Sequence, residues 1–253
     1  MSIIILIKTF RNYAFFALYL LSRPKLLLLL FKGIYLPQYI QYEWISRFRI
    51  NTFIDIGAND GNISQVINYL FPKATIFAFE PIKQKKNLIE SKIKSTNLIV
   101  ETLALSDHTG SQILYEYDFS PASSFLRPDP KVFKKKIAKS YPVKIITLNQ
   151  YFKKIQLKKP IFIKMDTEGT ENLIIRGGQK LLKQASIIIV ETSFTYYRKN
   201  QCLFDEIYSR LIKLGFTYKG NMPDSNYYPV FGPNRVENSI FIKKEMSTIY
   251  KIE

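Results

Sequence analysis

A buried strand that runs into a glycine loop constrains the fold of this chain more than any other feature. Thr52–Ile56 (TFIDI) is apolar enough to be buried on both faces and is followed at once by the loop GANDG. Apolar residues then recur at helical spacing over Asn62–Phe71, Pro72 ends that helix, and Thr75–Phe79 (TIFAF) predicts the next strand. Strand, glycine loop, helix and strand in this order are typical of a parallel sheet with helices on both faces.

The alternation of strands and helices continues along the chain. The stretch from His108 to Pro160 interrupts this regular pattern of strands and helices. Within it, apolar and polar residues alternate over Ser111–Tyr117, as in an antiparallel strand. Helices are expected over Thr170–Gln184 and Gln201–Leu214. Further strands are predicted over Asn97–Leu105, Val143–Thr147, Ile161–Met165, Ser186–Glu191, Phe216–Lys219 and Ser239–Lys243. These segments predict one α/β domain.

The composition excludes several metal and redox chemistries. Cys202 is the only cysteine, which rules out an intramolecular disulfide and a cysteine zinc site, and the single histidine, His108, rules out a multi-histidine metal site. The chain has 37 Lys and Arg residues against 20 Asp and Glu residues, a net charge of +17. This positive charge has two interpretations. It could bind an anionic partner, or it could reflect a general richness in lysine that is not directed at any partner. Lys131–Lys144 contains no recognisable nucleic-acid-binding module, so nucleic acid is not the favoured partner.

The first 42 residues form a basic and apolar appendage, because Glu43 is the first acid of the chain. Their longest uncharged stretch, Asn12–Ser22, is shorter than the roughly 20 residues that cross a bilayer, and Pro24 interrupts a helix through it. No signal-peptide cleavage site follows. The appendage is therefore either a peripheral anchor on an anionic membrane or a helical cap packed on the domain of residues 43–253. We expect a cytoplasmic protein, held at the inner face of a membrane under the first interpretation.

The charges of the glycine loop distinguish between its candidate ligands. The loop lies at the carboxyl end of the first strand, where doubly wound sheets bind nucleotide-like ligands. Two loop acids would repel a pyrophosphate, whereas S-adenosylmethionine carries an ammonium and a sulfonium and no phosphate. Its carboxylate can still bind the N–H groups at the start of the helix. The predicted cofactor contacts in this loop are Asp55, Gly57, Asn59, Asp60 and Gly61.

Two further acids extend the predicted cofactor site. Glu80 ends the second strand about 20 residues past the loop, where an acid accepts hydrogen bonds from ribose hydroxyls. The alternative to this ribose-binding role is that Glu80 is only an acid in the N-cap region of the next helix. Asp107 follows the third strand and could reach the adenine amino group.

At this point the sequence resembles the FkbM family of S-adenosylmethionine-dependent methyltransferases. The motifs FIDIGANDG, FAFEP, ALSD, SPASSF, KMDTEGTE and IIIVET occur in the family's order between Phe53 and Ser193. The resemblance implies a class I methyltransferase fold: a Rossmann-like, seven-stranded and mostly parallel sheet with its last strand antiparallel. It also implies oxygen methylation of small molecules and sugars. It does not cover residues 1–42, and it does not define the acceptor.

Asp166 and Glu168 follow the fourth strand in the sequence DTEG and are the predicted catalytic residues. Strand-like alternation places both carboxylates on one side. One of them could act as the general base, both could orient the hydroxyls of a sugar, or both could hold a divalent metal ion. The alternative is that they cap the helix that begins near Gly169.

Four other residues are weaker candidates for the acceptor pocket. Glu191 ends the fifth strand, Ser123 and Ser124 lie in a proline-rich loop that could form a lid, and His108 follows Asp107 directly. A lone histidine in a loop is more commonly just solvated.

The predicted function is that of an S-adenosylmethionine-dependent O-methyltransferase. Its acceptor is a small molecule or glycan, most specifically a sugar hydroxyl in a glycan, glycolipid or lipid-linked saccharide. The DTEG sequence stands where amine-methylating enzymes often carry Asn/Asp-Pro-Pro-Tyr, which disfavours amine acceptors. Two alternatives are a nucleic-acid methyltransferase that uses the basic surface and a non-enzymatic, membrane-peripheral protein with a methyltransferase fold.

Overall fold

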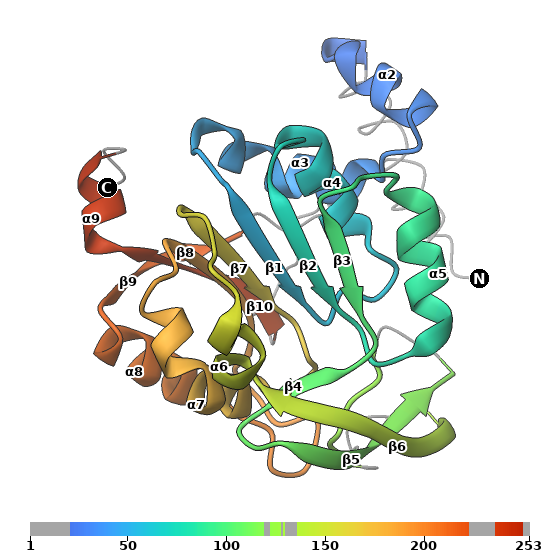
Figure 1. Cartoon of the computed structure of the whole chain (residues 1–253), viewed down its shortest axis with the longest axis vertical. Helices are drawn as coiled ribbons and strands as arrows, with labels where there is room; N and C mark the ends of the chain where they lie inside the picture. Colours follow the sequence, from blue (N-terminus) through green and yellow to red (C-terminus); the bar gives the residue numbers. More distant parts are fainter. Residues whose placement is uncertain (1–20, 119–121, 128, 130–135, 223–235, 250–253) are drawn as a thin grey trace, which may run out of the picture.

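The computed structural model describes residues 21–118, 122–127, 129, 136–222 and 236–249 (Figure 1). Most of the apolar runs in the appendage, at residues 1–20, lie outside the described residues. The same holds for the first part of the lysine-containing region, residues 131–135, and for the Ser-Pro pair that opens the SPASSF motif.

A seven-stranded sheet forms the centre of the molecule, in the order β3-β2-β1-β7-β8-β10-β9. Its parallel strands are β1 (Thr52–Ile56), β2 (Thr75–Phe79), β3 (Leu98–Glu101), β7 (Ile161–Met165) and β8 (Ile187–Ser193). The last strand, β10 (Val236–Lys243), runs antiparallel to both β8 and β9 (Phe216–Asn221). The predicted α/β fold, with a mostly parallel sheet and an antiparallel last strand, is confirmed.

Helices cover both faces of this sheet because successive residues of each strand point to opposite sides. Phe53 of β1 packs in the same core as α3 (Leu36–Tyr42) and α4 (Asn62–Leu70), whereas its neighbour Ile54 packs in the core on the other face. That second core contains side chains from α6 (Leu148–Tyr151), α7 (Glu171–Leu182) and α8 (Phe204–Lys213). The remaining elements are α2 (Lys25–Phe31), α5 (Lys83–Lys92), α9 (Lys244–Ile249) and the 3-10 helices at Glu43–Arg47 and Phe152–Lys154.

The third predicted strand, Asn97–Leu105, is wrong as a single element. The chain leaves the central sheet after Glu101, and β4 (Ala104–Ser106) belongs to a separate three-stranded sheet of order β4-β6-β5. Its partners are β5 (Gly110–Tyr117) and β6 (Ile137–Thr147). The apolar pattern continues through both segments, so it does not reveal that they serve two sheets. Close packing of α7 on β4 fixes the change of direction, since a Cβ on Gly177 would lie 2.2 Å from the carbonyl oxygen of Ser106.

The helix predicted from Gln201 begins three residues later, at Phe204. The side chain of Gln201 accepts a hydrogen bond from the backbone N–H of Tyr197 and donates one to the Ser193 hydroxyl. These bonds close the loop after β8, and they hold Gln201 and the buried Cys202 outside the helix.

The described part of the appendage packs on the domain and also exposes an apolar face. Leu26, Leu29 and Tyr42 are buried in the same core as the central sheet. On the other side of α2, Leu28 is 62% exposed and Phe31 is 90% exposed. Among the described residues, no helix combines the length and apolar character that a membrane crossing requires.

Candidate functional site

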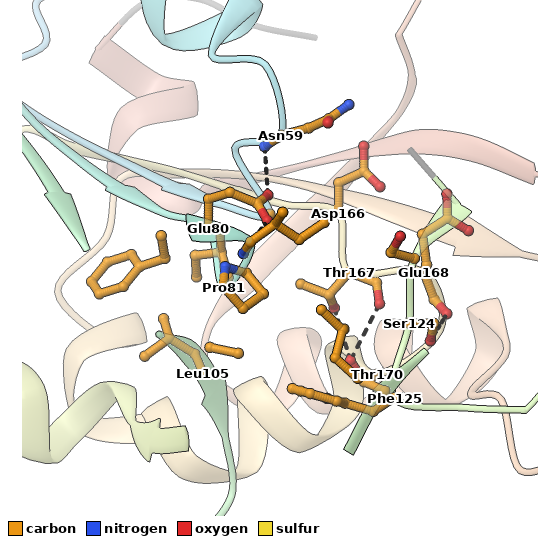
Figure 2. Close-up of a pocket in the computed structure, with 17 residues that line it drawn as sticks. Asn59, Glu80, Pro81, Leu105, Ser124, Phe125, Asp166, Thr167, Glu168 and Thr170 are labelled. Atoms are coloured by element: carbon orange, nitrogen blue, oxygen red, sulfur yellow. Dashed lines mark hydrogen bonds between the residues drawn. The ribbon is translucent and has the colours of Figure 1, made fainter. Parts of the chain in front are cut away.

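A cavity lies at the carboxyl ends of β1, β2 and β7 (Figure 2). The loops after these three strands supply most of its polar residues, and β4, β5 and residues 123–125 close it from the other side. The predicted site residues among its lining are Gly57, Asn59, Glu80, Ser123, Ser124, Asp166 and Glu168. Parallel strands therefore bring together residues that lie far apart in the sequence.

The glycine loop follows the edge of this cavity because Gly57 lets two backbones approach closely. Gly57 has a φ of 79°, and a Cβ at this position would lie 1.9 Å from the carbonyl oxygen of Asp166. Gly61 also has a positive φ, of 71°, and a Cβ there would lie 2.9 Å from the side chain of Ile89. The backbone shape of the loop thus requires glycine at both positions.

Glu80 connects the glycine loop to the segment before α5. Its carboxylate accepts hydrogen bonds from the backbone N–H groups of Asn59, at 2.8 Å, and Ile82, at 2.9 Å. Burial raises the pKa of this carboxyl, and the two hydrogen bonds oppose that rise. The bond to Ile82 gives Glu80 a local role before the helix, yet its side chain also lines the cavity (Figure 2).

The other predicted cofactor acids lie outside the lining of this cavity. Asp55 is fully buried beneath the loop, where its Oδ2 accepts a hydrogen bond of 2.6 Å from Ser64 and its Oδ1 has no partner among the described residues. Asp60 forms an ion pair with Lys85. Asp107 forms an ion pair with Arg176 and a 2.8 Å contact with Nδ1 of His108.

The pKa of Asp107 is lowered, first by its hydrogen bond with His108 and also by Arg176. The side chain of His108 is 62% exposed. Both Asp107 and His108 thus lie on the surface, beside the cavity rather than in its wall.

Three carboxylates converge beside the glycine loop. Asp166, Glu168 and Glu191 each offer an oxygen, and these oxygens all lie within 4.8 Å of one another. Glu168 is a non-glycine residue with a φ of 60°, a conformation that costs energy and is common at functional sites. The predicted pair on one side is therefore observed, but through a left-handed turn rather than a continued strand.

Two buried cations face this carboxylate cluster. Lys164 donates a hydrogen bond of 2.9 Å to Oδ2 of Asp166, and Arg198 donates one of 2.6 Å to Oε2 of Glu168. Both cations are only 3% exposed. Glu191 comes from β8, next to β7, and its carboxylate completes the cluster.

Burial raises the pKa of two carboxyl groups of this cluster. It raises the pKa of Glu168 to about 7, against the opposing effect of Arg198. It also raises the pKa of Glu191 well above its ordinary value, and the charges of Asp166 and Glu168 raise it further. Glu168 can therefore exchange a proton near neutral pH.

Neither Asp166 nor Glu168 caps α7, whose N-cap is Thr170. Glu171, the first residue of the helix, instead holds the turn before it, because its carboxylate accepts hydrogen bonds from the backbone N–H groups of Thr167, at 2.7 Å, and Gly169, at 3.1 Å. The side chains of Asp166 and Glu168 are left to face the cavity (Figure 2).

The loop of residues 122–127 is tied to the carboxylate cluster. Ser124 donates a hydrogen bond of 2.9 Å to the backbone carbonyl of Glu168, and Arg198 donates one of 3.0 Å to the backbone carbonyl of Ala122. The buried hydroxyl of Ser123 has no partner among the described residues and lines the cavity. Ser124 is thus a structural link, whereas Ser123 is available to a ligand.

A second cavity lies beside the first and shares part of its wall. Gly57, Asn59, Asp166 and Glu168 line both cavities. Glu191 and Lys164 line the second one, together with Asp60, Asn62 and two residues of the N-terminal segment, Tyr35 and Gln38. Glu191 is thereby placed in a cavity wall, as the sequence suggested, although not in that of the first cavity.

Sequence reasoning missed several residues of this site. Lys164 stands in the KMDTEGTE motif, two residues before Asp166, so strand alternation could have placed it on the same side. Arg198 lies in a loop after β8, outside any of the motifs, and no sequence signal points to it. Tyr35 and Gln38, in the N-terminal segment, also lie outside the motifs, and no sequence signal points to them.

Comparison with known proteins identifies one family. The family model for the methyltransferase FkbM domain matches residues 55–218. Among curated proteins, nothing matches this chain.

Solved methyltransferase structures resemble the chain in fold. Precorrin-6y C5,15-methyltransferase from Geobacter metallireducens is 15% identical, with 82% of this chain and 87% of that one covered and a TM-score of 0.42. Magnesium protoporphyrin IX methyltransferase from Synechocystis, solved with bound SAM, is 9% identical over 76% of this chain and 69% of that one, with a TM-score of 0.43. The plantazolicin methyltransferase BpumL, solved with SAH, is 10% identical over 84% and 83%, with a TM-score of 0.45. At such identities and TM-scores the likeness supports no inference about the acceptor.

Proposed function

Because the chain belongs to the FkbM family of methyltransferases, we propose that it transfers the methyl group of S-adenosylmethionine to a hydroxyl of a sugar. The sugar is part of a glycan, a glycolipid or a lipid-linked saccharide. The observation that carries this proposal is the convergence of Asp166, Glu168 and Glu191 beside the glycine loop. Carboxylates accept hydrogen bonds from hydroxyl groups, and one of them can take the proton that an oxygen acceptor releases.

The first cavity fits S-adenosylmethionine in shape and in chemistry. Gly57 lets the loop pack against the Asp166 backbone at the edge of the cavity, and the buried Glu80 carboxylate in the wall would accept hydrogen bonds from ribose hydroxyls. The apolar Phe79 and Leu105 line the same cavity and would contact the adenine ring. When bound, the cofactor supplies an electrophilic methyl group on a sulfonium.

The remaining predicted cofactor residues would act around this cavity. Asn59 and Gly61 shape the loop, and Asp55 and Asp60 give it negative charge that favours a cationic ligand over a phosphate. Asp107 would reach the adenine amino group only by exchanging its bond with Arg176.

Glu168 is the general base of the proposed reaction. A base works best when its pKa lies near the operating pH, and burial raises the pKa of Glu168 to about 7. Glu168 accepts the hydroxyl proton as the acceptor oxygen becomes bonded to carbon. Asp166, held by Lys164, accepts a hydrogen bond that orients the acceptor. Glu191, whose pKa burial raises well above its ordinary value, lies beside them as the third carboxyl group that can bond to an acceptor hydroxyl.

Calorimetry with S-adenosylhomocysteine tests the cofactor assignment directly. The unmutated protein should bind it, and Glu80→Ala should abolish the heat. Failure of the unmutated protein to bind would refute the proposal.

Transfer of labelled methyl groups then separates the acceptor classes: label should enter a cell-envelope glycan extract and not RNA. Label found only in RNA would favour the nucleic-acid alternative, whereas cofactor binding without transfer to either would favour a non-enzymatic role.

We also propose that residues 1–42 form an appendage that rests on an anionic membrane, at its cytoplasmic face, while residues 43–253 form the methyltransferase domain. The exposed Leu28 and Phe31 on α2, flanked by the exposed Lys25 and Lys32, support this contact. Co-sedimentation with vesicles of phosphatidylserine and phosphatidylcholine tests it. Binding should weaken in the Phe31→Ser variant and in vesicles of phosphatidylcholine alone. Equal binding in all three cases would contradict the proposal.

A further inference from the structure

The second cavity approaches the carboxylate cluster from the side of the N-terminal segment. It meets the first cavity at Gly57, Asn59, Asp166 and Glu168. Methyl transfer is an in-line displacement, so the acceptor oxygen must approach the methyl carbon from the side opposite the sulfur, with the base within reach of its proton. Since the first cavity fits the cofactor, the second is the one from which an acceptor can reach Glu168.

Helix α3 forms a firm wall of this second cavity. Leu36 and Tyr42 are buried in the core, 2% and 1% exposed, and Pro37 stands in the first turn of the helix, where its missing N–H costs nothing. Glu43, directly after α3, accepts two hydrogen bonds of 2.7 Å from Arg23. The helix therefore presents its cavity-lining side chains in a fixed position.

Two of these side chains are suited to a polyhydroxylated ligand. The Oε1 atom of Gln38 is buried and has no hydrogen-bond partner among the described residues. A buried carbonyl oxygen without a partner is costly, so a turn of the Gln38 side chain toward a ligand hydroxyl in the cavity would be favoured. Tyr35 is 48% exposed and offers an aromatic ring to the apolar face of a sugar.

The acids of the lining are largely balanced by neighbouring cations. Asp60, Asp166 and Glu168 pair with Lys85, Lys164 and Arg198, and Glu191 is the fourth acid of the described lining. The site therefore offers carboxylate oxygens that accept hydrogen bonds from neutral hydroxyl groups, while its cations are already engaged.

We infer that the cavity between α3 and the ends of β7 and β8 is the acceptor site, that it takes a neutral polyhydroxylated sugar unit, and that Tyr35 and Gln38 determine which sugar enters. This inference rests on the proposed function and extends it to the N-terminal segment. Both residues lie outside the 55–218 match, so the acceptor specificity of this chain depends on residues that its family domain does not supply.

Saturation kinetics with substituted proteins test the inference. The probe is a glycan and glycolipid extract of the envelope of cells that carry this gene, titrated with tritium-labelled S-adenosylmethionine at a fixed, saturating concentration. The variants are Gln38→Leu, Tyr35→Ala and Tyr35→Phe, with Gln184→Leu as the matched control because Gln184 is exposed and lines neither cavity.

Gln38→Leu and Tyr35→Ala should each raise the half-saturating extract concentration roughly three- to tenfold, the equivalent of one lost contact. Tyr35→Phe keeps the ring and Gln184→Leu leaves the cavity intact, so both should saturate as the unmutated protein does. Affinity for S-adenosylhomocysteine should be unchanged in all four variants. The melting temperature of Gln38→Leu should not fall, since the Oε1 atom that it removes has no hydrogen-bond partner among the described residues.

Unchanged saturation in both Gln38→Leu and Tyr35→Ala would overturn the inference while leaving the proposed function in place. Loss of cofactor affinity or of thermal stability in these variants would also overturn it, because the residues would then serve the fold. An extract that the unmutated protein leaves unlabelled, despite normal cofactor binding, would refute the glycan acceptor itself and the inference with it.

Discussion

Replacing Arg198 by methionine should displace the pH–rate profile to higher pH. Arg198 donates a hydrogen bond of 2.6 Å to Glu168 and is itself 3% exposed, so the pair is poorly screened by solvent. A hydrogen bond to a charged group contributes about 1.5–3 kcal/mol, and one pKa unit corresponds to about 1.4 kcal/mol. Loss of Arg198 should therefore raise the pKa of Glu168 from about 7 by about one to two units.

The direction follows from the role of Glu168 as a base. Only the ionised carboxylate accepts a proton, so the rate falls about tenfold per unit below the pKa and reaches a plateau above it. The unmutated protein should show this inflection near pH 7. Arg198→Met should lose roughly 5- to 50-fold in rate at neutral pH and recover most of it in alkaline solution.

The assay is the initial rate of S-adenosylhomocysteine release, measured across the pH range with a saturating glycan extract. Arg210→Met is the matched control, because Arg210 pairs with Glu206 one helical turn away on α8 and lines neither cavity. It should keep the unmutated profile. A uniform loss of rate at every pH in Arg198→Met would show that Arg198 only anchors the loop at Ala122. A flat profile through neutral pH in the unmutated protein would refute Glu168 as the base.

Three further results are expected. Gly57→Ala should abolish S-adenosylhomocysteine binding in calorimetry and lower stability to urea by more than about 1–2 kcal/mol, since the left-handed backbone is strained and the new Cβ meets the Asp166 carbonyl. Dialysis against EDTA should leave the rate unchanged, because two of the three clustered carboxylates already lie against buried cations; activation by added Mg²⁺ would instead indicate a metal site. Ile188→Ala, at a fully buried position of β8, should cost about 2–5 kcal/mol in urea unfolding, and a loss below 1 kcal/mol would contradict the assigned core.

Much of the central sheet was predictable because several of its strands are short apolar runs that stand between helices. The predicted Thr52–Ile56, Thr75–Phe79 and Ile161–Met165 match β1, β2 and β7 to the residue. The failure at Asn97–Leu105 has a physical cause: burial in the central sheet and burial against α7 require the same apolar residues. Periodicity reports that a segment is buried, but it does not report against which element.

The site was predictable where its residues follow strands, and unpredictable where tertiary contacts supply them. Asp166 and Glu168 could be found because the carboxyl end of a parallel strand faces the ligand cleft. Arg198 acts through a loop whose position depends on its hydrogen bonds with Ala122 and Glu168. Gln38 reaches the site only because α3 packs on the sheet. Neither position follows from local sequence.

The large positive charge of the chain does not extend into its site, and this contrast limits what the acceptor can be. The chain carries +17 overall, yet the lysine in the described lining of the second cavity, Lys164, is held by Asp166. Two further acids of that lining, Asp60 and Glu168, pair with Lys85 and Arg198. The phosphates of a nucleic acid attracted to the basic surface would meet cations that are already engaged, whereas the hydroxyl groups of a neutral sugar would meet carboxylate oxygens that accept hydrogen bonds. We therefore expect the surface charge to govern where the protein resides and the paired carboxylates to govern what it methylates.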